Sequence, residues 1–309
     1  MRVKIFIFNI IIGCILQSCI RRNATGGEEV SPVPTEHVVV IGIDGLTIEG
    51  LMQANTPVMD DLTANGAFKY DARTVLPTLS APNWGAMIHG AGPEANGIIS
   101  NDHKKWMQPV DRSRMGKFPS IFNIIREQLP EAEQGAIFHW SGFGQLFQEE
   151  TVNRFDTYNS PEETTRQVCE YIISKKPTFL FVQLDHVDGA GHRYRYNRTD
   201  YLKAVENADS LTGLIMESIR QAGIADNTLV MIVSDHGGIR RVHGGESEDE
   251  INVPVIFYGN GVKKNYKIQQ TVYMYDVAAN VAFALNLKPP HSWTGRPTLA
   301  AFEGHPEPE

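Results

Sequence analysis

Cysteine is scarce in this chain, whose 309 residues include three, at Cys14, Cys19 and Cys169. Only Cys169 lies outside the N-terminal segment, so we expect no internal disulfide and a buried, inert thiol at this position. Stability must then come from packing. A chain of 309 residues with 42% hydrophobic residues is ample for a sizeable core and has the composition of an ordinary globular protein.

Positive charge is also in short supply. Lys and Arg together number 28 against 36 Asp and Glu, which gives a formal net charge of -8 at pH 7. Non-specific binding of a nucleic-acid polymer requires a basic surface, so we expect no such binding. A small phosphorylated substrate is not excluded, because metal ions can supply positive charge locally.

Long apolar runs are lacking except near the N-terminus, where residues 5–16 follow Arg2 and Lys4. This run is too short for a comfortable transmembrane helix, and a basic start before an apolar core is typical of a signal peptide. The sequence LQSC at 16–19 resembles a bacterial lipobox, in which cleavage precedes a cysteine that becomes lipidated. We therefore predict a lipoprotein signal peptide at 1–18, a lipid anchor at Cys19 and an exported protein of the cell envelope. A plain membrane anchor is the alternative.

Internal repeats, low-complexity tracts and a second domain are not evident either. Residues 19–36 contain Gly, Pro and polar residues without periodicity, which predicts a flexible tether. Residues 37–309 are predicted to form a single domain in which buried-type strands alternate with amphipathic helices. Strands are expected at 37–43, 68–75, 136–139, 178–184, 228–234 and 253–258, and helices at 56–65, 118–129, 161–175, 199–222 and 275–285. This alternation predicts an α/β fold of three layers, α/β/α, around a mostly parallel sheet.

Acidic residues and histidines gather just after the predicted strands. They are Asp44, Asp188, His192, Asp235, His236 and His243. A single Asp after a strand is usually a cap or turn residue, and a lone His is usually structural, so the argument rests on their coincidence. Ligands bind at the carboxyl ends of strands in such sheets. Carboxylate with imidazole suits zinc, manganese or iron better than calcium, and six ligands suffice for two metal ions that clamp a phosphoryl group.

A hydroxyl group lies at another such boundary. Ser80 sits in LPTLSAPNW, between a β-like run and an apolar run, where a strand-to-helix turn is expected. Such a turn directs a side chain and free backbone N–H groups into one space, which suits a nucleophile that attacks an anion. A plain helix cap is the alternative interpretation.

Several motifs then occur in a specific order from about His37 to the C-terminal helix. They are VVVIGIDGL, NTPVMDDLTANGA, PTLSAPNW, GAGPEANGIISND, DGAGH, SDHGG, VHGG and PVIFYG. Together they resemble the alkaline phosphatase superfamily, and most closely its type I phosphodiesterase/nucleotide pyrophosphatase branch. The resemblance implies an alkaline phosphatase-like fold and two divalent ions, zinc above all, with manganese or iron as alternatives.

The resemblance also implies a role for each residue. One ion would be held by Asp188, His192 and His243. The other would be held by Asp44, Asp235 and His236, with Ser80 as its nucleophilic ligand. Asn101 would hydrogen-bond a phosphoryl oxygen.

The implied activity is hydrolysis of a small phosphorylated substrate, a nucleotide or other phosphodiester, through a phosphoseryl intermediate. Ser80 stands where the diesterase branch usually has Thr, so a phosphomonoesterase or phosphonate monoester hydrolase is the alternative. A phosphoryl-group transferase or a degenerate binding protein is less favoured. So is a sulfatase, because Trp84 replaces the Arg of the sulfatase motif.

Overall fold

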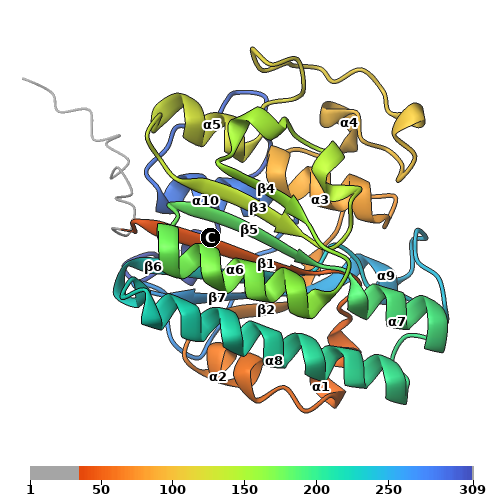
Figure 1. Cartoon of the computed structure of the whole chain (residues 1–309). Coiled ribbons are helices and arrows are strands. Elements are labelled where there is room, and N and C mark those ends of the chain that lie inside the picture. The colour runs from red at the N-terminus through yellow and green to blue at the C-terminus, as the bar shows by residue number, and fades with distance from the viewer. Residues whose placement is uncertain (1–34, 308–309) are drawn as a thin grey trace, which may run out of the picture. The chain divides into compact units, whose positions relative to one another are not determined.

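A computed structural model describes residues 35–307 of the chain. The predicted signal peptide, Cys19 and all but the last two residues of the predicted tether lie outside the described residues. Within 35–307, eight strands form one sheet in the order β4-β3-β5-β1-β6-β7-β2-β8 (Figure 1). The strands are β1 His37–Ile43, β2 Ala67–Arg73, β3 Gln134–Phe138, β4 Arg154–Thr157, β5 Phe179–Leu184, β6 Thr228–Val233, β7 Asn252–Gly259 and β8 Tyr266–Lys267.

Strand direction agrees with the predicted mostly parallel sheet. β1 lies between β5 and β6 and is parallel to both, and β3 and β4 continue the parallel arrangement. Only β7 is reversed, because it pairs antiparallel with β6 on one side and β2 on the other. The carboxyl ends of β5, β1 and β6 therefore meet at one edge of the sheet.

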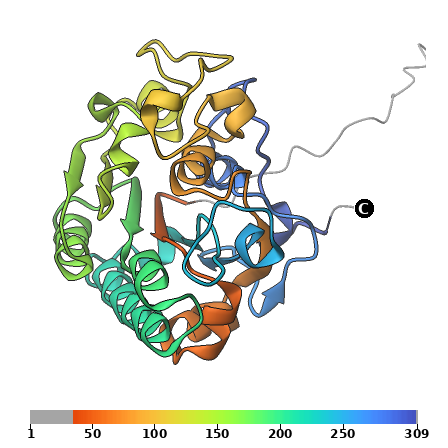
Figure 2. The same ribbon diagram turned by 90° about the vertical axis from the view of Figure 1, so that its right-hand side faces the viewer.

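Helices cover both faces of this sheet, as Figure 2 shows edge-on. They are α1 Ile48–Gln53, α2 Pro57–Ala64, α3 Ser80–His89, α4 Pro93–Asn96, α5 Ile121–Gln128, α6 Pro161–Lys175, α7 His186–Tyr194, α8 Thr199–Gln221, α9 Glu248–Ile251 and α10 Asp276–Ala284. Apolar residues of α3, α5 and α10 form one core, and those of α1, α2, α6 and α8 form the other. Val38 and Val40 of β1 contribute to the first core, whereas Val39 and Ile41 contribute to the second. The predicted three-layer α/β/α architecture is confirmed.

Local signals explain where several helices begin. Pro57 opens α2, where its missing N–H costs nothing, and Asn65 ends the helix. Ser120 forms a capping box with Asn123 at the start of α5. α6 begins after Ser160, whose side chain accepts from the Glu163 N–H. The predicted helices therefore agree with the observed ones to within a few residues. None of the helices in residues 35–307 has the length and apolar character needed to cross a membrane.

Elements without an apolar period were not predicted. β4 is a short edge strand with partly exposed side chains, and β8 contains only Tyr266 and Lys267. α1 and α7 were not predicted either; both are short, and the buried residues of α7 include Asp188 and Gly191 rather than a run of apolar side chains. Cys169 differs from expectation because it lies on the α6 surface that meets α8, where it is partly rather than fully buried, with Sγ 3.5 Å from the Leu214 carbonyl.

Trp84 of α3 is fully buried against the central strands. Its ring stands edge-on to Phe143 and Phe181, with ring centroids 6.0 Å from each. Gly42 of β1 lies beneath it, and a Cβ there would approach the Trp84 ring to 2.6 Å. A glycine is required at this position because the indole occupies the space that a side chain would need.

We expect Gly42→Ala to destabilise the fold by about 1–3 kcal/mol, because the new methyl group overpacks against an indole that has no free space to enter. Urea unfolding followed by circular dichroism measures the change. Gly189→Ala in α7 is the control, since a Cβ there meets no heavy atom within 4 Å. Equal midpoints for Gly42→Ala and wild type would contradict the packing argument.

Candidate metal centre and nucleophile

The six predicted ligands converge at the edge where β5, β1 and β6 end. Asp44 directly follows β1, and Asp235 and His236 follow β6. Asp188 and His192 lie one turn apart on α7, which begins after β5, so both face the same side of that helix. His243 arrives from the loop between β6 and α9. Neighbouring parallel strands thus bring together residues that are up to 199 positions apart in the sequence.

Asp188, His192 and His243 form the first group. The His192 Nε2 atom lies 3.2 Å from Asp188 Oδ2, and the His243 Nε2 atom lies 3.8 Å from Asp188 Oδ1. Each of the three offers one ligand atom within 4.8 Å of the others. This is the same trio that the resemblance implies for one ion.

His236 is the centre of the second group. Its Nε2 atom lies 3.4 Å from Asp44 Oδ1 and 3.2 Å from Asp235 Oδ2. Asp188 also comes within 4.8 Å of Asp44 and His236, so this carboxylate stands between the two groups. The His236 and His243 rings stack with centroids 3.6 Å apart, which places the groups side by side.

Each imidazole is oriented through its Nδ1 atom. Each Nδ1 atom lies within 2.9 Å of a backbone carbonyl oxygen. The carbonyl belongs to Arg241 for His192, to Gly237 for His236 and to Thr78 for His243. A carbonyl can only accept, so Nδ1 donates and Nε2 faces the carboxylates with a lone pair available in the neutral ring. Backbone contacts of this kind fix the tautomer that a metal ligand needs.

The buried carboxylates lack balancing charge. Asp44 and Asp235 are fully buried, and Asp44 Oδ1 and Asp235 Oδ2 have no hydrogen-bond partner. Burial, followed by the charges of Asp235 and Asp188, raises the pKa of Asp44 well above its usual range. Burial likewise raises the pKa of Asp235, against a hydrogen bond from the Gly45 N–H. Burial lowers the pKa of His236 to about 3, so this ring stays neutral.

These features suit divalent cations. Two unpartnered carboxylate oxygens and three oriented Nε2 atoms point into one space, and neutral imidazole with carboxylate is a ligand set for transition ions. A cation there would offset the cost of burying adjacent negative charges. The residues therefore fit the predicted metal chemistry, although they do not discriminate zinc from manganese or iron.

Ser80 begins α3 beside the second group. Its Oγ atom lies 3.3 Å from His236 Nε2, and the residue is buried. The N-terminus of α3 adds partial positive charge at this point. Asn101 is adjacent, because its Oδ1 atom accepts a 2.8 Å hydrogen bond from the Ala81 N–H. This bond leaves the Asn101 amide N–H groups to donate elsewhere.

Three further side chains support the ligands and were not predicted. Trp84 Nε1 and Gln183 Nε2 donate to Asp44 Oδ2 at 3.0 and 2.9 Å. The Tyr196 hydroxyl donates to Asp188 Oδ1. Gln183 offered a sequence signal, since it is a polar residue within the otherwise apolar strand β5. Tyr196 offered none, because its contact depends on how the chain turns after α7.

The chain belongs to the Metalloenzyme superfamily, whose family profile matches residues 38–289. This is the superfamily of alkaline phosphatase, so the predicted family membership is confirmed.

Its homologues in sequence are nucleotide pyrophosphatase/phosphodiesterases. Ectonucleotide pyrophosphatase/phosphodiesterase family member 1 of Mus musculus is 24% identical over 267 residues, which cover 80% of this chain and 29% of the relative. Human bis(5'-adenosyl)-triphosphatase is 22% identical over 212 residues, which cover 65% of this chain and 47% of the relative. The chain thus spans less than half the length of these relatives.

Solved structures share the fold. Murine ectonucleotide pyrophosphatase/phosphodiesterase 5 aligns with a TM-score of 0.68 at 16% identity, covering 82% of this chain and 96% of that one. An inactive form of that murine protein has been solved in complex with AMP. A putative sulfatase from Bacteroides thetaiotaomicron aligns with a TM-score of 0.71 at 14% identity, covering 89% and 75%. Both likenesses confirm the alkaline phosphatase-like fold.

In the metal-free full chain, we expect His192 to titrate near pKa 9 and Asp188→Asn to return it toward its ordinary 6.5, because the hydrogen bond to Asp188 is the main cause of the raised value. NMR of the imidazole C–H signals measures both values.

The raised pKa of His192 also makes stability depend on pH. Its contribution to the free energy of unfolding is fully present below about pH 6.5 and disappears as pH rises through about 9. A bound ion must displace the same proton, so metal affinity should rise over that window. Asp226→Asn is the control, and an unchanged His192 titration in Asp188→Asn would contradict the assignment.

Proposed function

We propose that this protein is a two-metal phosphohydrolase that cleaves phosphodiesters or nucleotide pyrophosphates through a phosphoseryl intermediate on Ser80. The main support for this proposal is the position of Ser80 at the start of α3. Its Oγ atom lies 3.3 Å from His236 Nε2, and His236 in turn adjoins the unpartnered oxygens of Asp44 and Asp235. A nucleophile, an Asp/His ligand set and a helix N-terminus converge there, which favours attack on an anionic phosphorus centre.

The residues divide into two ligand sets. Asp188, His192 and His243 would hold one divalent ion, and Asp44, Asp235 and His236 would hold the other, with Ser80 as an additional ligand. Zinc is the favoured ion. When bound, such ions polarise phosphoryl oxygens and lower the pKa of a coordinated hydroxyl.

The chain's own groups account for the remaining steps. Ser80 Oγ attacks phosphorus, so an Oγ–P bond forms as the ester P–O bond breaks, and the proton lost by the Ser80 hydroxyl is balanced by the proton that the departing oxygen takes up to leave as the alcohol. Water then attacks the same phosphorus, breaks the Oγ–P bond and restores the Ser80 hydroxyl. Asn101 is positioned to donate from its amide to a phosphoryl oxygen, since its Oδ1 is held by the Ala81 N–H.

Charge favours a diester over a monoester. A monoester carries about one more negative charge near neutral pH, because its second phosphate pKa is ~6. α3 contains no Lys or Arg, and within residues 35–307 the three site carboxylates form ion pairs only with histidines. The matched oxygen contact, Asn101, is neutral and suits a singly charged group. The sequence relatives and the AMP complex of the murine neighbour are consistent with a small nucleotide-like substrate.

A sulfatase is less favoured, although sulfatases share the fold. The sulfatase motif needs a cationic side chain where this chain has Trp84. That indole is fully buried and donates to Asp44, so it leaves no room for a cation contact with substrate.

For the cellular setting, we propose export as a lipoprotein anchored through Cys19. The proposal rests on the basic start, the short apolar run and the LQSC sequence at 16–19.

We expect the purified full chain to contain about two equivalents of zinc or a similar transition ion, because six ligands serve two sites. Elemental analysis measures the content. Chelation should abolish turnover, and added zinc or manganese should restore it. His192→Ala and His236→Ala should each lose about one equivalent, whereas His305→Ala, outside the site, should lose none. Full activity without metal would exclude the mechanism.

Ser80→Ala should lower kcat by several orders of magnitude while the unfolding midpoint changes little, because the substitution removes one hydroxyl from a helix start. Steady-state kinetics and trapping of a phosphorylated Ser80 peptide test the role. Ser174→Ala on the exposed face of α6 is the matched control. Near-normal turnover of Ser80→Ala would place the nucleophile elsewhere.

Bis(p-nitrophenyl) phosphate should be a better substrate than p-nitrophenyl phosphate in kcat/KM, because the site lacks a cationic side chain to balance a dianion. Both rates are measured on one protein batch with saturating zinc. A monoester preference of about tenfold, equivalent to about 1.4 kcal/mol of transition-state discrimination, would instead assign a phosphomonoesterase. A preference for p-nitrophenyl sulfate would contradict phosphoryl transfer altogether.

A further inference from the structure

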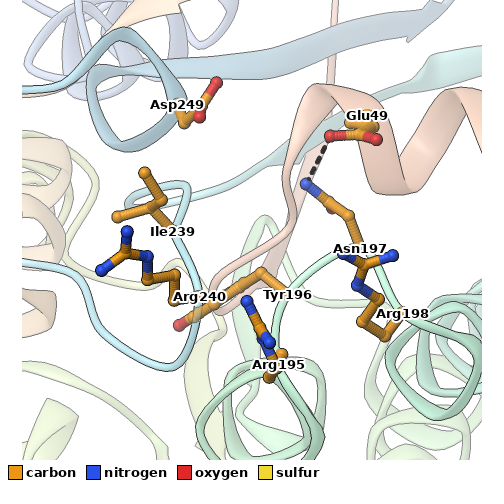
Figure 3. Close-up of a pocket in the computed structure, with 9 residues that line it drawn as sticks. Glu49, Arg195, Tyr196, Asn197, Arg198, Ile239, Arg240 and Asp249 are labelled. Atoms are coloured by element: carbon orange, nitrogen blue, oxygen red, sulfur yellow. Dashed lines mark hydrogen bonds between the residues drawn. The ribbon is translucent and has the colours of Figure 1, made fainter.

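Tyr196, whose hydroxyl donates to Asp188, also lines a polar cavity. This cavity has a volume of about 210 Å³ and is lined by the turn after α7 and the loop after β6 (Figure 3). Figure 3 shows Arg240 on one flank of Tyr196, Arg198 on the other and Arg195 between them, with Asp249 and Glu49 across the cavity, and all three arginines are exposed. We call it the arginine cavity.

The three guanidinium groups have no protein partner in the part of the chain that the structure describes. Within residues 35–307, no side-chain hydrogen bond or ion pair is formed by Arg195, Arg198 or Arg240, whereas Arg166 pairs with Glu163 and Glu170. Glu49 is already engaged, because it accepts from Asn197 Nδ2 and Gln53 Nε2, both at 2.8 Å. These amide donors are neutral, so Glu49 and Asp249 both keep their charge, and the three guanidinium groups exceed the two carboxylates by one.

The backbone that carries these arginines is strained. Arg195 has φ 78°, Asn197 has φ 59° and Arg240 has φ 58°, all in the region that favours glycine. Within residues 35–307 only six non-glycine residues have positive φ, and three of them line this one cavity. Strained conformations of this kind cluster at functional sites, where the side chain is needed in spite of its backbone cost.

A single side chain separates the cavity from the metal centre. Tyr196 donates its hydroxyl to Asp188, while its backbone N–H donates to the Arg240 carbonyl at 2.8 Å. Its ring also fills the space above Gly238, where a Cβ would approach the ring to 2.4 Å. The cavity is therefore adjacent to the ligands but walled off from them.

We propose that the arginine cavity is a second anion site, separate from the catalytic groups, that binds a small oxyanion of the phosphate or sulfate type. Planar guanidinium groups match the oxygens of such ions with paired hydrogen bonds, and the three of them outnumber the two carboxylates that line the cavity. The cavity holds an ion of this size. Its occupancy does not depend on the activity proposed for Ser80.

The positive φ angles of Arg195 and Arg240 allow a test that separates sulfate binding from stability. Arg195→Gly/Arg240→Gly relieves two positive-φ positions, so the double variant should be at least as stable as wild type toward urea. It should nevertheless bind sulfate about tenfold or more weakly at the arginine cavity, because two of the three guanidinium groups are gone, whereas sulfate bound at the metal centre should be unaffected. Arg193→Gln is the matched control: this neighbouring exposed arginine stacks on Tyr194 and does not line the cavity.

Equilibrium dialysis of radiolabelled inorganic sulfate against the zinc-loaded full chain measures the binding, with ionic strength held constant because screening weakens all such contacts. Sulfate isotherms that agree for wild type and the double variant would overturn the proposal. So would an equal loss in Arg193→Gln, which would indicate only a general charge effect.

Competitive inhibition of diester hydrolysis by sulfate should be the same in wild type and in the double variant. A change confined to that inhibition would assign the arginines to the substrate site instead. Because dialysis requires no turnover, absence of diesterase activity would leave this test intact.

Discussion

The structure is organised around three buried carboxylates that repel one another. Asp44, Asp188 and Asp235 come from three different segments and share one small space at the end of the central strands. Charges of one sign are costly to bury unless opposite charge balances them. The imidazoles of His192, His236 and His243 meet the carboxylates with oriented Nε2 atoms, and the remaining unpartnered oxygens create the demand for cations.

The core and the centre are continuous through Trp84. Its ring packs among Phe143 and Phe181, while its indole N–H holds Asp44 in place. Trp84 and Ser80 belong to the same helix, so the packing of α3 against the sheet also positions the proposed nucleophile. The glycine at position 42 is part of this arrangement, because it leaves the space that the indole occupies. The contacts that pack α3 against the sheet therefore also determine where Ser80 and Asp44 lie.

Positive charge is distributed unevenly around the centre. The chain is acidic overall, with a net charge of -8, and its ligand sets are acidic as well. Yet Arg195, Arg198 and Arg240, which have no side-chain partner among residues 35–307, line one cavity together with Tyr196. A hydrogen-bonded path through Tyr196 joins Arg240 to Asp188, so the two regions share a structural wall. In our proposal, Tyr196 contacts both the metal centre and the anion site.

The positions of the longer strands and helices, the mostly parallel sheet and the convergence of the six candidate ligands were predictable from the sequence. Apolar runs that end in Asp at 37–44 and 228–235 identify buried parallel strands, and such strands bring their carboxyl ends together at one edge of the sheet. The family resemblance added the nucleophile and the grouping of ligands. Only the tertiary structure showed that Asp188 stands between the two groups, because that depends on the angle at which α7 leaves β5. The support from Trp84, Gln183 and Tyr196 and the gathering of arginines arise from contacts between distant segments. No local pattern encodes such contacts, since a side chain's partners are set by how the layers pack and where the loops turn.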